Sequence, residues 1–130
     1  MKCLCQLLMR LIFCTLLFVL FFTACQKELA TEAALRIHNT SNIAYDSVLV
    51  NAPGGKQLYH TIAAGGYSGY KPFLFLYNYA YIEVYFNNQV LKLQPLDYVG
   101  EEKLKPGKYR YELKVITGQQ SSLVLECKKD

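Results

Sequence analysis

The sequence predicts an all-β protein, a single antiparallel β-sandwich of about 7–8 strands that follows a cleaved helical signal peptide. Three observations support this fold class. Apolar residues recur at every second position in short segments, these segments are rich in tyrosine and β-branched residues, and glycine, proline or asparagine residues separate them. Alternation with a period of two is typical of strands that bury one face. We therefore expect one sandwich domain over residues 34–130.

Residues 1–24 predict a secretory signal peptide. Positive charge from Lys2 and Arg10 precedes an apolar run, which ends at the small residues Thr23 and Ala24, directly before Cys25. This is the three-part plan of a cleaved leader. The apolar run is shorter than the about 20 residues that a membrane-spanning helix needs, which disfavours a simple transmembrane anchor.

Residues 22–25, with the sequence FTAC, resemble the lipobox of bacterial lipoproteins, of the type common in Bacteroidota. The resemblance implies that the chain is cut before Cys25, that its sulfur receives a diacylglycerol, and that its amino group receives an acyl chain such as palmitate. Two or three acyl chains hold a domain on a bilayer where one does not. By the family's sorting rule, Gln26 implies delivery to the outer membrane, with the periplasmic face and the cell surface both open. The alternative is that Cys25 merely ends an ordinary signal region.

Residues 25–33 then form the lipidated cysteine and a short polar tether. After removal of Lys2 and Arg10 with the leader, 12 Lys and Arg residues remain against 10 Asp and Glu. This balance is too weak and too scattered to indicate a nucleic-acid partner. Cys127 is left without a partner for a disulfide, and we expect it to be a small buried apolar residue.

Strands are expected at 34–39 and 45–51, which alternate apolar and polar residues on either side of the turn-prone residues 40–42. Gly54 and Gly55 then permit a tight turn into a strand at 57–62, because glycine adopts positive φ at little cost. A glycine-rich loop at 63–69 follows.

Residues 70–86 are apolar at both odd and even positions and are too long for one strand, so we divide them at Asn78 into strands 70–77 and 79–86. Residues 87–89 close a hairpin onto a strand at 90–95, because asparagine tolerates the left-handed conformation of such turns. A turn precedes a strand at 108–115, which forms a last hairpin with 122–127.

The pattern L-x-P-G-x-Y, from Leu104 to Tyr109, resembles the tyrosine corner of Greek-key sandwiches. Immunoglobulin-like, fibronectin type III and transthyretin-like domains share this corner. The resemblance implies a structural role for Tyr109, whose hydroxyl would bond to backbone a few residues upstream. Residues 35–51 also resemble the opening of small envelope sandwich domains, which implies fold and hardly function.

The sequence has no pattern of a catalytic, metal or cofactor site. His38 and His60 lie in expected strands without a nearby acid motif, and Glu101 and Glu102 point apart in an extended chain. We expect no enzyme activity, no metal and no cofactor. A cleft lined by Asp97, Glu101 or His60 would favour an enzyme instead.

Tyrosine is the compositional oddity, with 11 residues. Tyrosine is enriched at protein interfaces and its ring stacks on sugars, although it is also a good strand former. The candidate binding face consists of Tyr77, Tyr79, Tyr81 and Tyr85. The sequence thus predicts a lipid-anchored envelope lipoprotein that acts as a non-catalytic binding or structural domain with an envelope-protein partner.

The alternative is a carbohydrate-binding surface lipoprotein. Its platform would use two or three of the following tyrosines: Tyr67, Tyr70, Tyr77, Tyr79 and Tyr81. Such a platform needs coplanar exposed rings with polar groups beside them.

Overall fold

The computed structural model describes Gln6 and residues 32–130. Apart from Gln6, the predicted signal peptide lies outside the described residues, as do Cys25 and most of the tether. Within the part that is described, no helix is long and apolar enough to cross a membrane.

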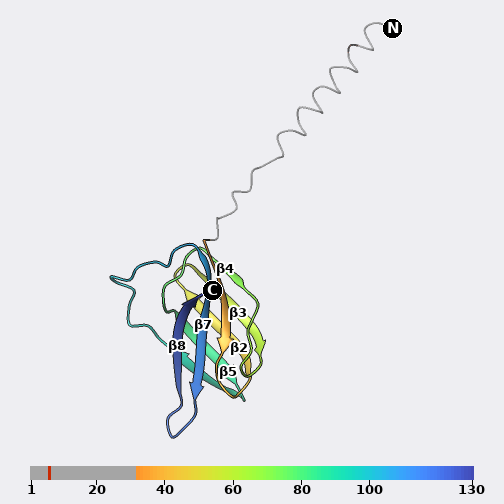
Figure 1. The fold of residues 1–130 in the computed structure, drawn as a ribbon, viewed down its shortest axis with the longest axis vertical. Coiled ribbons are helices and arrows are strands. Elements are labelled where there is room, and N and C mark those ends of the chain that lie inside the picture. Colours follow the sequence, from red (N-terminus) through yellow and green to blue (C-terminus); the bar gives the residue numbers. More distant parts are fainter. Residues whose placement is uncertain (1–5, 7–31) are drawn as a thin grey trace.

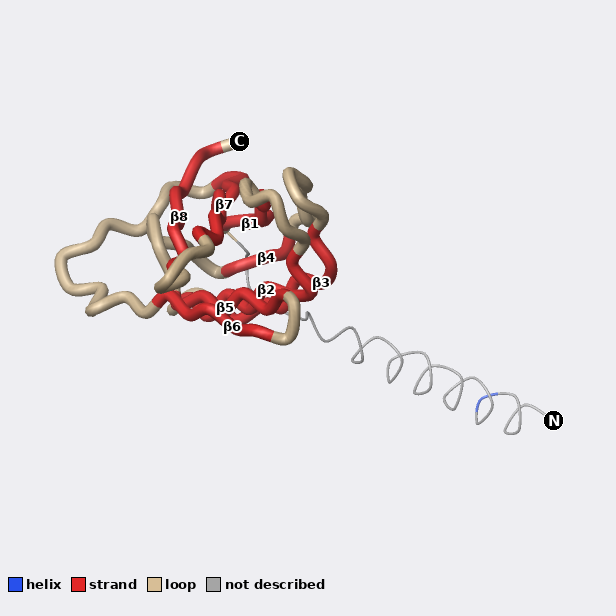
Figure 2. Tube along the Cα trace, turned by 90° about the horizontal axis from the view of Figure 1, so that it is seen from below, coloured by secondary structure: helices blue, strands red, loops and turns tan. Residues whose placement is uncertain are grey.

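Eight strands form two four-stranded sheets that pack face to face, which confirms the predicted β-sandwich (Figure 1, Figure 2). The first sheet has the order β4-β1-β7-β8, and the second has the order β3-β2-β5-β6. The strand bounds are β1 Ala33–Asn39, β2 Tyr45–Ala52, β3 Gly55–Ile62, β4 Lys71–Phe73, β5 Tyr81–Phe86, β6 Gln89–Leu93, β7 Gly107–Ile116 and β8 Ser122–Lys129.

One strand pair departs from the expected antiparallel arrangement. β1 and β7 run parallel, in a register from Ala33 opposite Gly107 to Asn39 opposite Leu113. All other pairs of strands in the two sheets are antiparallel. The chain first returns beside β1 as β4, which pairs antiparallel on one side, and it adds the parallel partner β7 on the other side only after β5 and β6 of the second sheet.

The expected strands at 70–77 and 79–86 are shorter in the structure, because residues 74–80 form no strand. These residues cross from β4 in the first sheet to β5 in the second. Leu76 and Ala80 are fully buried on the way. The segment is apolar at both odd and even positions because it fills one end of the sandwich and not because it is a strand with two covered faces.

That end of the sandwich, which we call the tether end, is where β1 begins. β7 also begins there and β8 ends there, because Ala33 lies opposite Gly107 and Tyr109 lies opposite Lys129. A hydrogen bond of 2.9 Å from the Leu74 amide to the Gly54 carbonyl joins the two sheets at this end. The tether end therefore also holds the β2–β3 turn, residues 74–80 and the connection from β6 to β7 (Figure 1).

Four tyrosines belong to the core, namely Tyr45, Tyr59, Tyr109 and Tyr111. Each hydroxyl donates to a backbone carbonyl, as a buried phenol requires. Tyr45 donates to the Leu113 carbonyl at 2.9 Å, and Tyr59 donates to the Leu35 carbonyl at 2.8 Å. Tyr109 donates to the Lys105 carbonyl at 2.7 Å, and Tyr111 donates to the Tyr77 carbonyl at 2.6 Å. The bonds of Tyr45 and Tyr59 run from the second sheet to the first. A large part of the tyrosine content thus ties the sandwich together.

At the end opposite the tether end, Asn39 is the main buried polar side chain. Its amide nitrogen lies within 3.2 Å of the carbonyl oxygens of Ile43, Ile62 and Ala63. Its side-chain oxygen accepts a hydrogen bond from the Ser41 amide at 2.9 Å. The Asn39 side chain therefore provides hydrogen-bond partners for backbone groups of three chain segments that meet beyond the ends of the strands.

Candidate functional site

The four tyrosines predicted to form one binding face lie in two places. Tyr77 and Tyr79 belong to the crossing segment 74–80. Tyr81 and Tyr85 lie on β5, on the outer face of the second sheet, where residues alternate with the buried Ile82 and Val84. All four retain some exposure, but they do not share one strand face, because β5 begins only at Tyr81 and Tyr77 and Tyr79 precede it in the crossing segment.

Tyr77 and Tyr79 are packed against the connection between β6 and β7, residues 94–106, which we call the long loop. The Tyr98 ring of this loop lies 5.3 Å from the Tyr79 ring, in a stacked arrangement, and 5.2 Å from the Tyr77 ring. The Tyr79 hydroxyl donates to the Asp97 carbonyl at 2.9 Å. The Tyr77 and Tyr79 rings therefore pack the long loop against the domain.

Tyr81 and Tyr85 share one carboxylate. Both hydroxyls donate to Glu83, which lies between them on β5, and Lys92 of β6 approaches the same carboxylate at 3.2 Å. The hydrogen bonds from Tyr81 and Tyr85, followed by the contact with Lys92, lower the pKa of Glu83 to about 2. The outer face of β5 is thus a row of phenols arranged around a stable negative charge.

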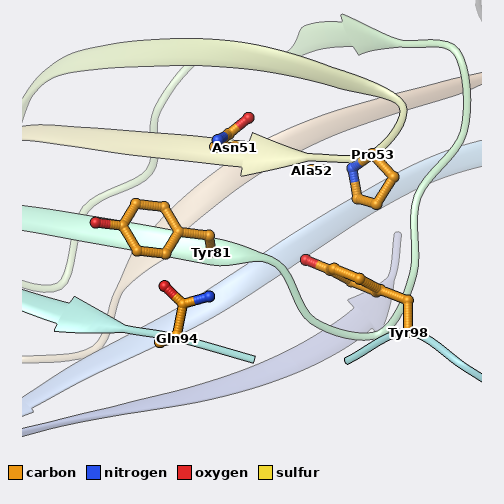
Figure 3. Close-up of a pocket in the computed structure, with 6 residues that line it drawn as sticks. All are labelled: Asn51, Ala52, Pro53, Tyr81, Gln94 and Tyr98. Carbon is orange, nitrogen blue, oxygen red and sulfur yellow. The ribbon is translucent and has the colours of Figure 1, made fainter. Parts of the chain in front are cut away.

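An open pocket lies where this face meets the tether end (Figure 3). Its volume is about 480 Å³, and it is lined by Asn51, Ala52, Pro53, Tyr81, Gln94 and Tyr98. In Figure 3 the rings of Tyr81 and Tyr98 flank the space, and the Gln94 amide and Tyr98 hydroxyl point into it. Rings, hydroxyls and amides together suit a ligand with both apolar faces and hydrogen-bonding groups.

Tyr67 and Tyr70 lie over the outer face of the first sheet. The Tyr67 ring stacks on His38 with centroids 4.0 Å apart, and the Arg36 guanidinium lies 4.4 Å from its centroid. The Tyr70 hydroxyl donates to Asp130. Tyr81 faces outward from the other sheet, so a sugar platform of two or three tyrosines cannot combine it with Tyr67 or Tyr70.

The charged groups beneath Tyr67 and Tyr70 pair with one another. Glu112 accepts hydrogen bonds from Lys128 at 2.8 Å and from Arg110 at 2.9 Å, and these donors lower its pKa to about 2. Arg36 lies 2.6 Å from Asp130, in an ion pair that lacks hydrogen-bond geometry. Opposite charges are therefore matched across this face.

Tyr109 has the hydrogen bond that the tyrosine-corner resemblance implies. Its hydroxyl donates to the Lys105 carbonyl, four residues upstream, at 2.7 Å. The ring is buried, and its position at the start of β7 fixes the direction in which the long loop enters the strand. This contact is structural.

The titratable groups that could serve chemistry are dispersed. Among the described residues, no group of three or more His, Cys, Asp or Glu side chains is placed to hold a metal ion. His60 lines a separate hollow with Tyr67 and Tyr70, whereas Asp97 and Glu101 lie on the long loop. Cys127 is half-buried on β8, and burial raises the pKa of its thiol to about 11.

The sequence pattern alone did not indicate Tyr98, Gln94 and the apolar residues of the long loop. The available signal was that Leu96 and Val99 follow Pro95 in a segment without strand alternation. Apolar residues outside any buried pattern are candidates for contact with something other than the core.

No family model matches the sequence, and no curated protein matches it. Among solved structures, an NMR structure of a protein from Eubacterium rectale is similar, with a TM-score of 0.55 over 76% of this chain and 92% of that one. The two sequences are 9% identical. A likeness at this identity concerns the fold alone.

Proposed function

We propose that this protein is a lipid-anchored lipoprotein of the cell envelope, whose sandwich domain acts by binding and not by catalysis. The observation that carries the proposal is the FTAC sequence ending at Cys25, followed after seven residues by the first strand at Ala33. A seven-residue tether reaches at most about 25 Å. The domain would therefore be held close to the bilayer that contains the lipid.

The proposed binding role is supported by the open pocket near the tether end. It gathers two phenol rings and two side-chain amides from β2, β5 and the long loop. β2 and β5 are neighbouring strands of one sheet, so Asn51 and Tyr81 are held on a rigid framework. An envelope-protein partner that inserts a side chain there is the expected ligand.

The test compares Cys25→Ser with Cys127→Ser in the producing cell. We expect Cys25→Ser to leave the membrane fraction and to lose the mobility shift of acylation, because the lipid has no other attachment point in this proposal. The Cys127→Ser variant loses one cysteine, as Cys25→Ser does, but should fractionate like the unchanged protein. Membrane association that survives Cys25→Ser unaltered would contradict the proposal.

A second candidate function is carbohydrate binding at the same pocket. The observation in its favour is that Tyr81 and Tyr98 flank a space lined by the amides of Asn51 and Gln94. Rings stack on the apolar faces of sugars, and amides bond to their hydroxyls. This reading uses Tyr81 of the tyrosines first proposed for a platform.

The carbohydrate candidate is tested by a glycan array followed by titration of any glycan that binds. Tyr81→Ala should abolish the binding. Tyr85→Ala is the matched control, because it removes the other phenol bonded to Glu83 but lies outside this pocket. Equal loss in both variants, or an array on which nothing binds, would exclude the candidate.

A further inference from the structure

The most exposed large apolar side chains of the described domain lie on the long loop. Leu96 is 103% exposed and Val99 is 87% exposed. The next of this kind, Tyr67, is 51% exposed and stacks on another side chain. Contact between these two aliphatic side chains and water carries a free-energy cost that burial in an apolar environment would remove.

The long loop holds them outward in a defined shape. Tyr98, between them, turns inward onto Tyr79 and Tyr77, and the Val99 amide bonds to the Asp97 carboxylate at 3.2 Å. The Glu101 amide bonds to the Tyr98 carbonyl at 3.2 Å, and Gly100 has a φ of 80°. A positive φ at the third position of such a turn favours glycine. The exposure of Val99 is therefore built into the turn, and Leu96 is exposed three residues before Val99.

The long loop stands at the tether end of the sandwich. It connects Leu93, which lies opposite Ile82 near the start of β5, to Gly107, which lies opposite Ala33. The Gly107 amide donates to the Glu32 carbonyl at 2.9 Å, so the end of the loop is bonded to the last described residue of the tether. Figures 1 and 2 both show the loop projecting beside the body of the sandwich.

We propose that Leu96 and Val99 insert into the lipid bilayer that holds the anchor, so that the domain rests on the membrane in one orientation. This inference depends on the proposed function, because the lipid on Cys25 is what places a bilayer beside the tether end. Lys103 and Lys105 on the loop are outnumbered by Asp97, Glu101 and Glu102. Apolar insertion and not charge would therefore supply the attraction.

The absence of tryptophan from the sequence makes a direct test possible. Val99→Trp introduces a single reporter on the loop, and Ile116→Trp introduces one at the opposite end, on a side chain that is also exposed. The lipidated proteins are reconstituted into phosphatidylcholine vesicles with brominated acyl chains. We expect the emission of the Val99→Trp variant to shift to the blue and to lose most of its intensity, whereas that of Ile116→Trp should be unchanged.

A second measurement uses the unlabelled loop. A protease specific for glutamate should cut at Glu101 and Glu102 more slowly when vesicles are present. The double variant Leu96→Ser, Val99→Ser should lose this protection while remaining attached through Cys25. Both side chains are outside the core, so these substitutions leave the fold intact.

The outcomes separate the two proposals. Acylated protein that floats with vesicles while the Val99→Trp emission stays unquenched would overturn membrane insertion alone. Protein whose Cys25 carries no lipid would overturn the lipoprotein proposal, and membrane insertion with it. Quenching of both reporters to the same extent would show non-specific adsorption and would also overturn the proposed orientation.

Discussion

Replacing Gly54 by alanine probes how closely the crossing segment packs on the β2–β3 turn. A Cβ atom at this position would lie 2.0 Å from the Phe75 carbonyl oxygen and 2.7 Å from its amide nitrogen. Contacts below 3.0 Å are not tolerated, so the backbone of the segment would have to move by about 1 Å. That movement would also break the hydrogen bond from Leu74 to Gly54.

The expected loss of stability is about 2–3 kcal/mol. Overpacking costs about 1–3 kcal/mol and the lost hydrogen bond about 1 kcal/mol, while the stiffer unfolded chain returns about 0.4–1 kcal/mol. The measurement is equilibrium unfolding in urea, followed by circular dichroism. Gly69→Ala is the matched control, since nothing lies within 4 Å of its Cβ position and its φ is not positive.

We expect Gly69→Ala to stay within about 0.5 kcal/mol of the unchanged protein. A Gly54→Ala protein as stable as this control would refute the reasoning. It would mean that residues 74–80 do not press on the turn, and that the tether end is looser than described.

Three further predictions concern buried or paired groups. Asn39→Ala should lower the free energy of unfolding in urea by about 2–3 kcal/mol, because it leaves several backbone carbonyls without a hydrogen-bond donor. Asn51→Ala, in the open pocket, should leave the free energy of unfolding unchanged. The hydrogen bond from Lys128 lowers the pKa of Glu112 to about 2, whereas the pKa in the unfolded chain is about 4.3. The ionised Glu112 therefore contributes its full stabilisation above pH 4.3, and this stabilisation is lost as the pH falls towards 2. Unfolding of Glu112→Gln should therefore depend less steeply on pH in that window, and an identical slope would disprove the linkage. With a pKa of about 11, the Cys127 thiol should react slowly with a disulfide reagent at pH 8 and rapidly once urea unfolds the chain; equally fast reaction in the folded protein would show that burial does not control it.

The strands whose bounds were predicted well are those with one buried face and one solvent-exposed face. The strand expected at 108–115 is found at Gly107–Ile116, and the one expected at 45–51 is found at Tyr45–Ala52. Buried and less buried side chains alternate through Tyr109–Ile116 of β7 and through Val48–Ala52 of β2, so the period of two is visible in the sequence. The Asn87 and Asn88 turn was also predictable, because both residues have positive φ.

The prediction was wrong where the chain crosses between sheets. Residues 74–80 bury Leu76 and Ala80 in the core and leave their other apolar side chains half-buried, which gives the same apolar pattern as a strand covered on both faces. The same crossing separates the tyrosines of the candidate face, since Tyr77 and Tyr79 lie in it and Tyr81 and Tyr85 lie on β5. The packing of Tyr98 on Tyr77 joins residues 21 positions apart and leaves no periodic signal in the sequence.

The tether end concentrates the features that bear on function. The open pocket, the long loop and the start of β1 all lie there. A domain held by a short tether would place this end towards the bilayer and the opposite turns away from it. Partner binding at the pocket would then occur close to the membrane surface.

The most direct test of the lipoprotein account is mass spectrometry of the mature N-terminus, isolated from the membranes of the producing cell. The account predicts that Cys25 is the first residue and that its peptide carries the added mass of a diacylglycerol, with or without a further acyl chain. A mature chain that begins at another residue, or a Cys25 of unmodified mass, would contradict it.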